Sequence, residues 1–150
     1  MDIDEFLKTR DLSSYTNLPF IKKVPKPWGY ELIFTPDGLA YTGKIIHIEA
    51  GKRLSLQVHD KKQESYFLAK GKGGVMLENT QGELERIELE ENQGYTVAVG
   101  QKHRLFGITD CDIFEASTPE SGTTYRLEDD YQRPNETEEL RQDPNRGWNS

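Results

Sequence analysis

The middle of this 150-residue chain alternates polar and apolar residues in short segments, and this pattern constrains the fold most. From Leu39 to about Phe114, a Gly, Asp or Asn interrupts the alternation roughly every 6–12 residues, as in "YTGKIIHIEA", "LSLQVH", "SYFLAKG" and "CDIFEAS". A period of two is typical of β-strands with one buried face. No helical stretch of about 12 residues separates the strands, so the pattern disfavours a parallel α/β sheet and predicts an antiparallel sandwich or barrel.

The two ends of the chain lack this alternation, so the chain divides into three parts. A short helix is predicted over residues 3–9, because its apolar residues share one face. After Tyr131 the composition becomes polar and charged, with Trp148 among few apolar residues, which favours a partly disordered tail. We therefore expect an N-terminal arm (1–24), one barrel domain (25–131) and a polar tail (132–150).

Charge and composition exclude several classes of partner. The net charge is -7, whereas nucleic acid binding needs a cationic surface, so we expect no nucleic acid partner. A few local basic residues still suffice for a small phosphorylated ligand. Cys111 is the single cysteine, which excludes an intrachain disulfide. No run approaches the ~20 apolar residues of a membrane helix, and the N-terminus lacks a signal peptide's apolar core, so we expect a cytoplasmic protein without a membrane partner.

One predicted strand, "RLSLQVH", carries candidate metal ligands on a single side. Residues two apart in a strand point the same way, so Gln57 and His59 share a face with Arg53. The segment "DKKQ" is predicted to turn the chain, after which Glu64 begins a returning strand beside His59. Gln57, His59 and Glu64 are thus expected to converge from two adjacent strands.

His103 is the expected fourth ligand, because it follows the turn "VGQK" and starts another strand. Imidazole, carboxylate and amide groups form a ligand set suited to Zn, Mn, Fe, Co or Ni. Two histidines and one carboxylate with open positions are also the arrangement of non-haem iron enzymes. Gln57 has a second interpretation, in which its amide binds a metal-bound water. Taken singly, His59 and His103 are compatible with packed or turn histidines.

The spacing of these residues resembles the conserved motifs of the cupins. The first cupin motif runs Gly, five residues, His-x-His, four residues, Glu, six residues, Gly, and its places are filled here by Gly51, Gln57, His59, Glu64 and Gly71. Glutamine stands in place of the first histidine. The second motif is matched by "AVGQKHRLFG", with alanine for its proline and glycine for its asparagine. The resemblance implies an all-β, antiparallel double-stranded β-helix, or jelly-roll barrel.

Four segments, "KPWGYELIF", "GKRLSLQVH", "VGQKHRL" and "STPESGTTYRLEDDYQR", resemble more narrowly the cupin domain of type II phosphomannose isomerases, in a stand-alone version. That family has a Ser-Leu-Gln-x-His metal strand, so Gln57 is the residue it uses. It also has a Gly-x-x-His-Arg turn and a closing Arg-x-Glu-Asp-x-Tyr-Gly-Arg stretch. Here Gln132 replaces the glycine of that stretch, and "SGTTY" replaces a more acidic segment.

The resemblance implies a metal-dependent isomerase that interconverts an aldose and a ketose phosphate of the mannose 6-phosphate type. The implied metal ligands are Gln57, His59, Glu64 and His103, around a divalent ion. Basic residues are expected to bind the phosphate, because a guanidinium fork matches two of its oxygens; the candidates are Arg53, Lys44, Arg126 and Arg133. For each of them, an ion pair or a solvated position is the structural alternative. The general base is not identified.

Two further functions stay open at this point. The first is a non-haem iron dioxygenase that uses His59, Glu64 and His103. The second is a non-catalytic module that binds a sugar, for which the altered "SGTTY" segment is the sequence support. A small phosphorylated sugar is the expected partner. A homodimer formed through a free strand edge or the N-terminal strand is compatible with such a barrel.

Overall fold

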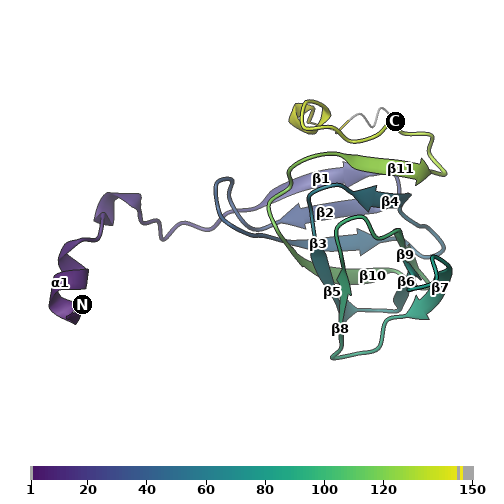
Figure 1. Cartoon of the computed structure of the whole chain (residues 1–150), viewed down its shortest axis with the longest axis horizontal. Coiled ribbons are helices and arrows are strands. Elements are labelled where there is room, and N and C mark those ends of the chain that lie inside the picture. Colours follow the sequence, from purple (N-terminus) through teal and green to yellow (C-terminus); the bar gives the residue numbers. More distant parts are fainter. Residues whose placement is uncertain (1, 145, 147–150) are drawn as a thin grey trace.

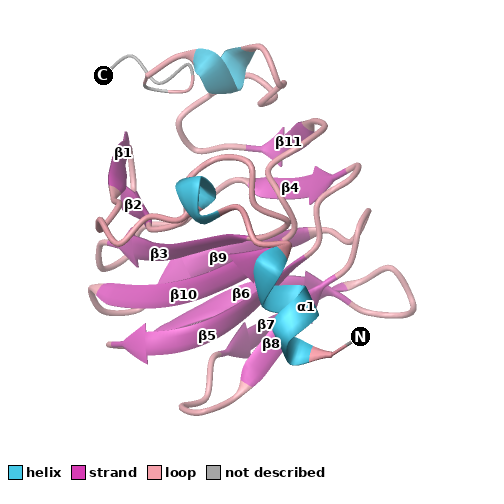
Figure 2. Ribbon diagram, turned by 90° about the vertical axis from the view of Figure 1, so that its left-hand side faces the viewer, coloured by secondary structure: helices cyan, strands magenta, loops and turns pink. Residues whose placement is uncertain are grey.

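The computed structural model describes residues 2–144 and Arg146, in which eleven strands form two antiparallel sheets (Figures 1 and 2). The six-stranded sheet has the order β1 (Lys22–Lys26), β2 (Gly29–Ile33), β3 (Thr42–Ile48), β10 (Cys111–Ser117), β5 (Glu64–Lys70) and β8 (Gly94–Val97). The five-stranded sheet has the order β11 (Thr124–Glu128), β4 (Leu56–His59), β9 (His103–Gly107), β6 (Gly73–Glu78) and β7 (Leu84–Glu88). The predicted antiparallel all-β architecture is confirmed.

The hydrophobic core lies between the two sheets and follows from the alternation within the strands. Ile46 and Ile48 of β3 and Ile113 of β10 point inward from the six-stranded sheet. Val75 of β6 and Leu105 of β9 meet them from the five-stranded sheet. All five side chains are at most 1% exposed. Burying each contributes roughly 1.5–3 kcal/mol, so the period-two pattern is what brings the sheets together.

The segment "GVMLENTQGELERIEL" has two alternating arms around Asn79–Gly82, and the hairpin that this pattern predicts is confirmed, connecting β6 to β7. The side-chain oxygen of Asn79 accepts hydrogen bonds from the backbone N–H groups of Gln81 (3.0 Å) and Glu83 (2.9 Å). Gly82 has a φ of 79°, in the left-handed region that glycine adopts without strain. The turn chemistry of this segment is therefore local, which explains why the sequence alone predicts it.

The pairing predicted between the strands of His59 and Glu64 is wrong. β4 pairs with β11 and β9, whereas β5 pairs with β10 and β8 in the other sheet. The segment "DKKQ" therefore crosses between the sheets and does not close a hairpin. His59 and Glu64 approach each other across the barrel interior. Spacing alone does not distinguish these arrangements, because a hairpin would place the two side chains side by side on one face and facing sheets bring them together across the interior.

Two strands were not predicted from the sequence, and both are edge strands. β1 contains Pro25, which has no N–H for a ladder, but a strand with a neighbour on one side only tolerates proline. β11 lies at the edge of the five-stranded sheet, and Thr124 forms an isolated bridge there with Glu136. That bridge ties the C-terminal part of the chain to the barrel.

The two ends of the chain lie differently on this barrel (Figure 1). Residues 2–23 are all exposed, and the N-terminal arm, defined as residues 2–21, projects away with α1 (Ile3–Lys8) and the 3-10 helix η1 (Leu12–Ser14). The C-terminal segment, defined as residues 132–144 and Arg146, runs over β11 and includes the 3-10 helix η2 (Leu140–Gln142). Trp148 lies outside the described residues. None of the helices described is long and apolar enough to span a membrane.

Candidate metal centre and adjoining pocket

Three candidate ligands come together inside the barrel. His59 ends β4, Glu64 begins β5 and His103 begins β9, and each is at most 3% exposed. Their ligand atoms all lie within 4.8 Å of one another. Nε2 of His103 is 2.9 Å from Oε1 of Glu64, and Nε2 of His59 is 3.4 Å from the same oxygen. We call these three residues the His/Glu/His triad.

Neighbouring groups turn both imidazoles toward the centre of the triad. Nδ1 of His103 lies 2.9 Å from the carbonyl oxygen of Gln101, which accepts only, so Nδ1 carries a proton and Nε2 is the nitrogen that can offer its lone pair to a bound ion. Nδ1 of His59 lies 2.8 Å from the hydroxyl of Thr124. Nε2 of His59 is buried and forms no hydrogen bond. An unpartnered buried imidazole nitrogen that faces a carboxylate fits a metal ligand.

The protonation states also suit a metal. Burial alone would raise the pKa of Glu64, but Lys62 and the two histidines hold that pKa well below its usual value. Burial lowers the pKa of His59, which favours its neutral form. The hydroxyl of Tyr66 donates a hydrogen bond to the Glu64 carboxylate. A carboxylate and neutral imidazoles are the forms in which these residues bind divalent ions.

Gln57 lies beside the triad, with its amide nitrogen toward it. Its Oε1 accepts a hydrogen bond of 2.7 Å from the hydroxyl of Ser55, and its Nε2 is 3.3 Å from Nε2 of His103. Rotating the amide by half a turn would present the oxygen to the triad, and the Ser55 hydroxyl would then accept instead of donating. The structure therefore brings all four sequence-predicted ligands together, with Gln57 able to serve as a ligand or as a partner of bound water.

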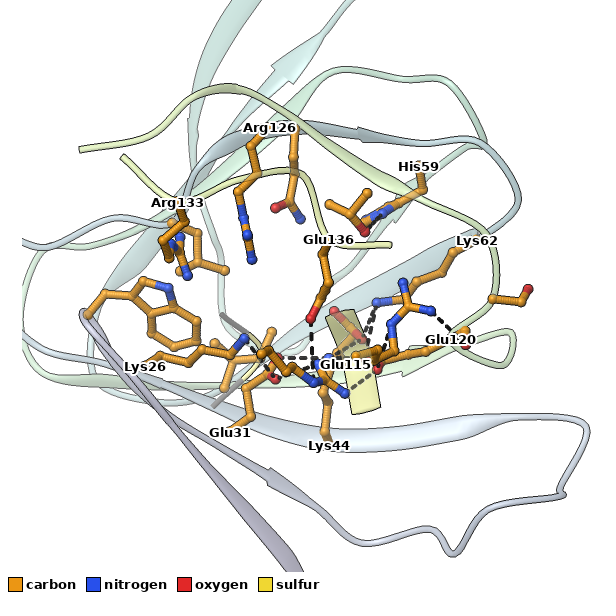
Figure 3. A pocket seen from close by; sticks show the side chains of 18 of the residues that line it. Lys26, Glu31, Lys44, His59, Lys62, Glu115, Glu120, Arg126, Arg133 and Glu136 are labelled. Carbon is orange, nitrogen blue, oxygen red and sulfur yellow. Dashed lines mark hydrogen bonds and ion pairs between the residues drawn. The ribbon is translucent and has the colours of Figure 1, made fainter. Parts of the chain in front are cut away.

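A pocket of about 50 Å³ adjoins the triad, and His59 and Gln57 line it (Figure 3). The hydrogen-bond donors Lys26, Arg126 and Arg133 lie toward one side of the pocket in Figure 3; together with Trp28, which also lines the pocket, they form the donor-rich wall. Paired acids and bases also line the pocket: Glu31, Lys44, Lys62, Glu115, Glu120, Glu136 and Arg146. The pocket thus combines a candidate metal centre, a donor-rich wall and a buried ion-pair network.

The donor-rich wall has more donors than acceptors. Nε1 of Trp28 and Nε of Arg126 are buried without a hydrogen-bond partner. Burial lowers the pKa of Lys26 to about 8, and its ammonium is 4.0 Å from the carboxylate of Glu31. Arg133 differs, because it forms a bidentate pair with Asp129 at 2.8 and 3.0 Å. Unpartnered buried donors favour an anionic ligand at this wall.

The ion-pair network connects the triad to the C-terminal segment. Lys62 lies 3.0 Å from Glu64 and 3.2 Å from Glu115. Lys44 lies 3.6 Å from Glu115, 2.7 Å from Glu31 and 2.6 Å from Glu120. These six residues are buried or, for Glu120, nearly so. Pairing of this kind is what allows so many charges to lie inside a barrel.

Arg146 completes the network from the C-terminal segment. Its guanidinium lies 3.3 Å from Glu31, 2.5 Å from Glu120 and 3.4 Å from Glu136, with 6% of the side chain exposed. No feature of the sequence predicted that Arg146 would be buried, because it lies in a polar tail. Glu115 did have a signal: it occupies an inward position of β10, two residues after the buried Ile113, where an apolar residue is the rule.

Three of the four predicted substrate-binding residues line the pocket, and one does not. Lys44, Arg126 and Arg133 line the pocket, although Lys44 and Arg133 are already paired with acids. Arg53 does not line it; its half-exposed side chain forms a salt bridge of 2.7 Å with Asp130. The ion-pair alternative is thus what the structure shows for Arg53. Lys26, Lys62 and Trp28 are pocket residues that sequence reasoning did not assign to the site.

Comparison with solved structures shows the fold. Oxalate decarboxylase from Bacillus subtilis superposes with a TM-score of 0.61 and 16% identity, over 76% of this chain and 33% of that chain. KdgF from Halomonas sp. superposes with a TM-score of 0.56 and 14% identity, over 67% of this chain and 86% of that one. At these identities the likeness extends to the barrel alone.

Comparison of sequences shows the family. The xanthan biosynthesis protein XanB of Xanthomonas campestris pv. campestris is 36% identical over 85 residues, which are 56% of this chain and 17% of XanB. This chain therefore matches only a small part of that relative. The family model described as mannose-6-phosphate isomerase C-terminal matches residues 15–136. With most of its length matched and the predicted jelly-roll barrel present, the chain belongs to the mannose-6-phosphate isomerase C-terminal family of cupins.

Proposed function

We propose that this chain is a metal-dependent isomerase that interconverts an aldose phosphate and a ketose phosphate of the mannose 6-phosphate type. The observation that carries the proposal is that the pocket with the donor-rich wall adjoins the His/Glu/His triad, through His59 in its lining. A sugar phosphate has the two matching ends: oxygens that bind a metal and a phosphate that accepts hydrogen bonds.

His59, Glu64 and His103 would hold the divalent ion, with Gln57 beside them. The ion would supply polarisation of the sugar carbonyl and stabilisation of the negative charge that develops on its oxygens. Arg126, Trp28 and Lys26 would bind the phosphate and so fix the distance of the sugar from the triad. Orienting a substrate in this way is itself a large part of catalysis.

The isomerisation also needs a group that moves a proton between neighbouring sugar carbons. Glu115 is a carboxylate of the pocket lining, and Lys62 links it to Glu64, at 3.2 Å from Glu115 and 3.0 Å from Glu64. We assign the proton transfer to Glu115: its carboxylate takes the proton from one carbon, and the resulting acid returns it to the next. Glu64 is excluded from this role because it is a metal ligand.

The pocket must open before such a substrate binds. Its volume of about 50 Å³ holds a few water molecules, whereas small-ligand pockets are roughly 300 Å³ or larger. Glu136, Arg141 and Arg146 of the C-terminal segment project into it. We therefore propose that this segment moves off the pocket when substrate enters, which breaks the Thr124–Glu136 bridge and frees space beside the donor-rich wall.

The test is an isomerase assay with mannose 6-phosphate and fructose 6-phosphate after loading with Mn²⁺, Co²⁺ or Zn²⁺. We expect turnover, loss of bound metal in His59→Ala, and a higher KM with metal retained in Arg126→Ala. Glu115→Gln should lower kcat by about 10²-fold or more with metal content unchanged. Arg86→Ala, on the exposed β7, is the matched control. Absence of turnover with these and other hexose and pentose phosphates would overturn the proposal.

The same protein preparations separate the two alternatives. Two histidines and one carboxylate are also the ligands of non-haem iron dioxygenases, so uptake of dioxygen with Fe²⁺ and a catechol or diketone would favour that function. Saturable binding of a sugar phosphate by calorimetry without turnover would favour a non-catalytic module. The closed state of the pocket is the structural feature that supports this last alternative.

A further inference from the structure

Among the described residues, the hydrogen bonds of the N-terminal arm join only neighbours within the arm, and Phe20 near its end lines a pocket beside the barrel. Asp2 caps α1 by accepting a hydrogen bond from the N–H of Asp4, and Asp11 caps η1 through the N–H of Ser13. α1 has six residues, and isolated helices shorter than about 12–15 residues are marginal in water. The arm nevertheless exposes eight large apolar side chains, each by 40–75%: Ile3, Phe6, Leu7, Leu12, Tyr15, Leu18, Phe20 and Ile21.

A second apolar surface, partly exposed, lies on the outer face of the six-stranded sheet. The register places Leu32 of β2, Ile45 of β3, Phe114 of β10 and Phe67 of β5 in one row across four strands. Their neighbours Ile46, Ile113 and Leu68 point into the core, so this row points outward. The outer face of an antiparallel sheet is normally polar when water covers it. We call these four residues the outer row.

The surroundings of the outer row resemble those of a protein interface. Phe34 is 40% exposed and stacks on Phe114, with 5.6 Å between ring centroids, which widens the apolar area. The next outward row is polar, and in it His47 lies 2.6 Å from Asp112. An apolar centre with a polar rim is the usual anatomy of a protein–protein contact.

We propose that two copies of this chain form a two-fold dimer in which the arm of each copy crosses the outer row of the other. Each chain has both an arm and an outer row. In a two-fold dimer, the arm of each copy can therefore cover the outer row of the other, as an isologous interface requires. The arm projects away from its own barrel in Figure 1, which favours exchange over folding back.

Size and charge also favour the arm of a second copy as the segment that covers the outer row. A stable interface buries about 800 Å² per partner, and an arm with eight apolar side chains laid on a four-strand row supplies contact of that order. The arm has four acids and two bases, for a net charge of −2. On the receiving face, Lys23 and Lys70 point outward beside the row. This inference does not depend on the proposed enzymatic function, because the outer row is on the opposite surface of the sheet from the pocket.

The first test is the mass of the full chain in solution, by light scattering or sedimentation. We expect a dimer that becomes a monomer when residues 1–21 are removed. Phe67→Asp should dissociate it while circular dichroism stays unchanged. Ile108→Asp is the matched control, because Ile108 is similarly exposed but lies outside the outer row, and this variant should stay dimeric. A monomeric full chain, or an unchanged dimer after removal of the arm, would overturn the proposal.

A cross-linking experiment identifies which copy the arm covers. In a Cys111→Ser background, one preparation carries Leu12→Cys in the arm and a second carries Ser65→Cys on β5. After mixing and mild oxidation, a disulfide between the two preparations forms only if an arm reaches another copy, and we expect this heterodimer. Glu85→Cys on β7 replaces Ser65→Cys as the control and should not cross-link. If only a chain carrying both cysteines reacts, and reacts internally, the arm covers its own barrel and the proposal is wrong.

Discussion

The two ends of this chain invert the usual relation between polarity and burial. The N-terminal arm is rich in large apolar side chains, and all of its residues are exposed. The C-terminal segment is polar, yet Arg133, Glu136 and Arg146 are at most 9% exposed. Burial therefore depends on the surface that a segment meets: the mouth of the barrel presents acids to Arg146, whereas the described part of the chain leaves the large apolar side chains of the arm 40–75% exposed.

The largest expected effect comes from breaking the C-terminal contact. Arg146→Ala leaves Glu31, Glu120 and Glu136 without one of their cations, and removing one partner of a buried ion pair destabilises by about 3–5 kcal/mol. Arg86→Ala is the control, since the Arg86–Glu88 pair is exposed and should contribute at most about 1 kcal/mol. Urea unfolding measures both. Equal losses in the two variants would mean that the segment only rests on the barrel.

Acid should weaken the same contact by a somewhat smaller amount. Burial alone would raise the pKa of Glu31, but Lys44, Lys26 and Arg146 lower it to about 2, from 4.5 in an unfolded chain. The ionised carboxylate therefore stabilises the fold above about pH 4.5, and this stabilisation is lost as the pH falls toward 2. We expect a loss of up to about 3 kcal/mol in urea unfolding. The profile should be flatter in Glu31→Gln and unchanged after removal of residues 1–21.

The smallest change in unfolding free energy should come from substitutions in the N-terminal arm. Leu18 is 75% exposed, so Leu18→Ser should change the unfolding free energy of a monomeric barrel by less than about 0.5 kcal/mol. In the proposed dimer the same change removes apolar contact and should raise the dissociation constant about tenfold, or about 1.4 kcal/mol. Sedimentation at several concentrations measures this. A stability loss in the monomer as large as that of Arg146→Ala would erase the contrast between the two ends.

Much of the site was predictable because its signals are local. The spacing of Gln57, His59 and Glu64 within one short stretch indicated a metal centre, and "VGQK" indicated His103 at the start of a strand. The predicted route to their convergence was wrong, since β4 and β5 lie in different sheets. His59 and Glu64 still lie close together, because two facing sheets bring inward side chains together as well as paired strands do.

The ion pairs of the pocket were not predictable, because their residues are distant in sequence. Lys44 contacts Glu120 across 76 positions, and Arg146 contacts Glu31 across 115. Nothing in the sequence distinguishes these charges from solvated ones, since burial of a charge depends on a partner brought by the fold. Arg53 shows the converse: it shares a strand face with the ligands but pairs at the surface with Asp130.

By itself, the sequence determined the antiparallel barrel, the β6–β7 hairpin and the identity of the triad, because these follow from alternation, turn chemistry and short spacing. Only the tertiary structure decided that the polar tail closes the pocket and that the apolar arm stays uncovered. The physical reason is that alternation and turns act between neighbours in the chain, whereas pairing of buried charges and covering of apolar surface require segments that folding or association brings together.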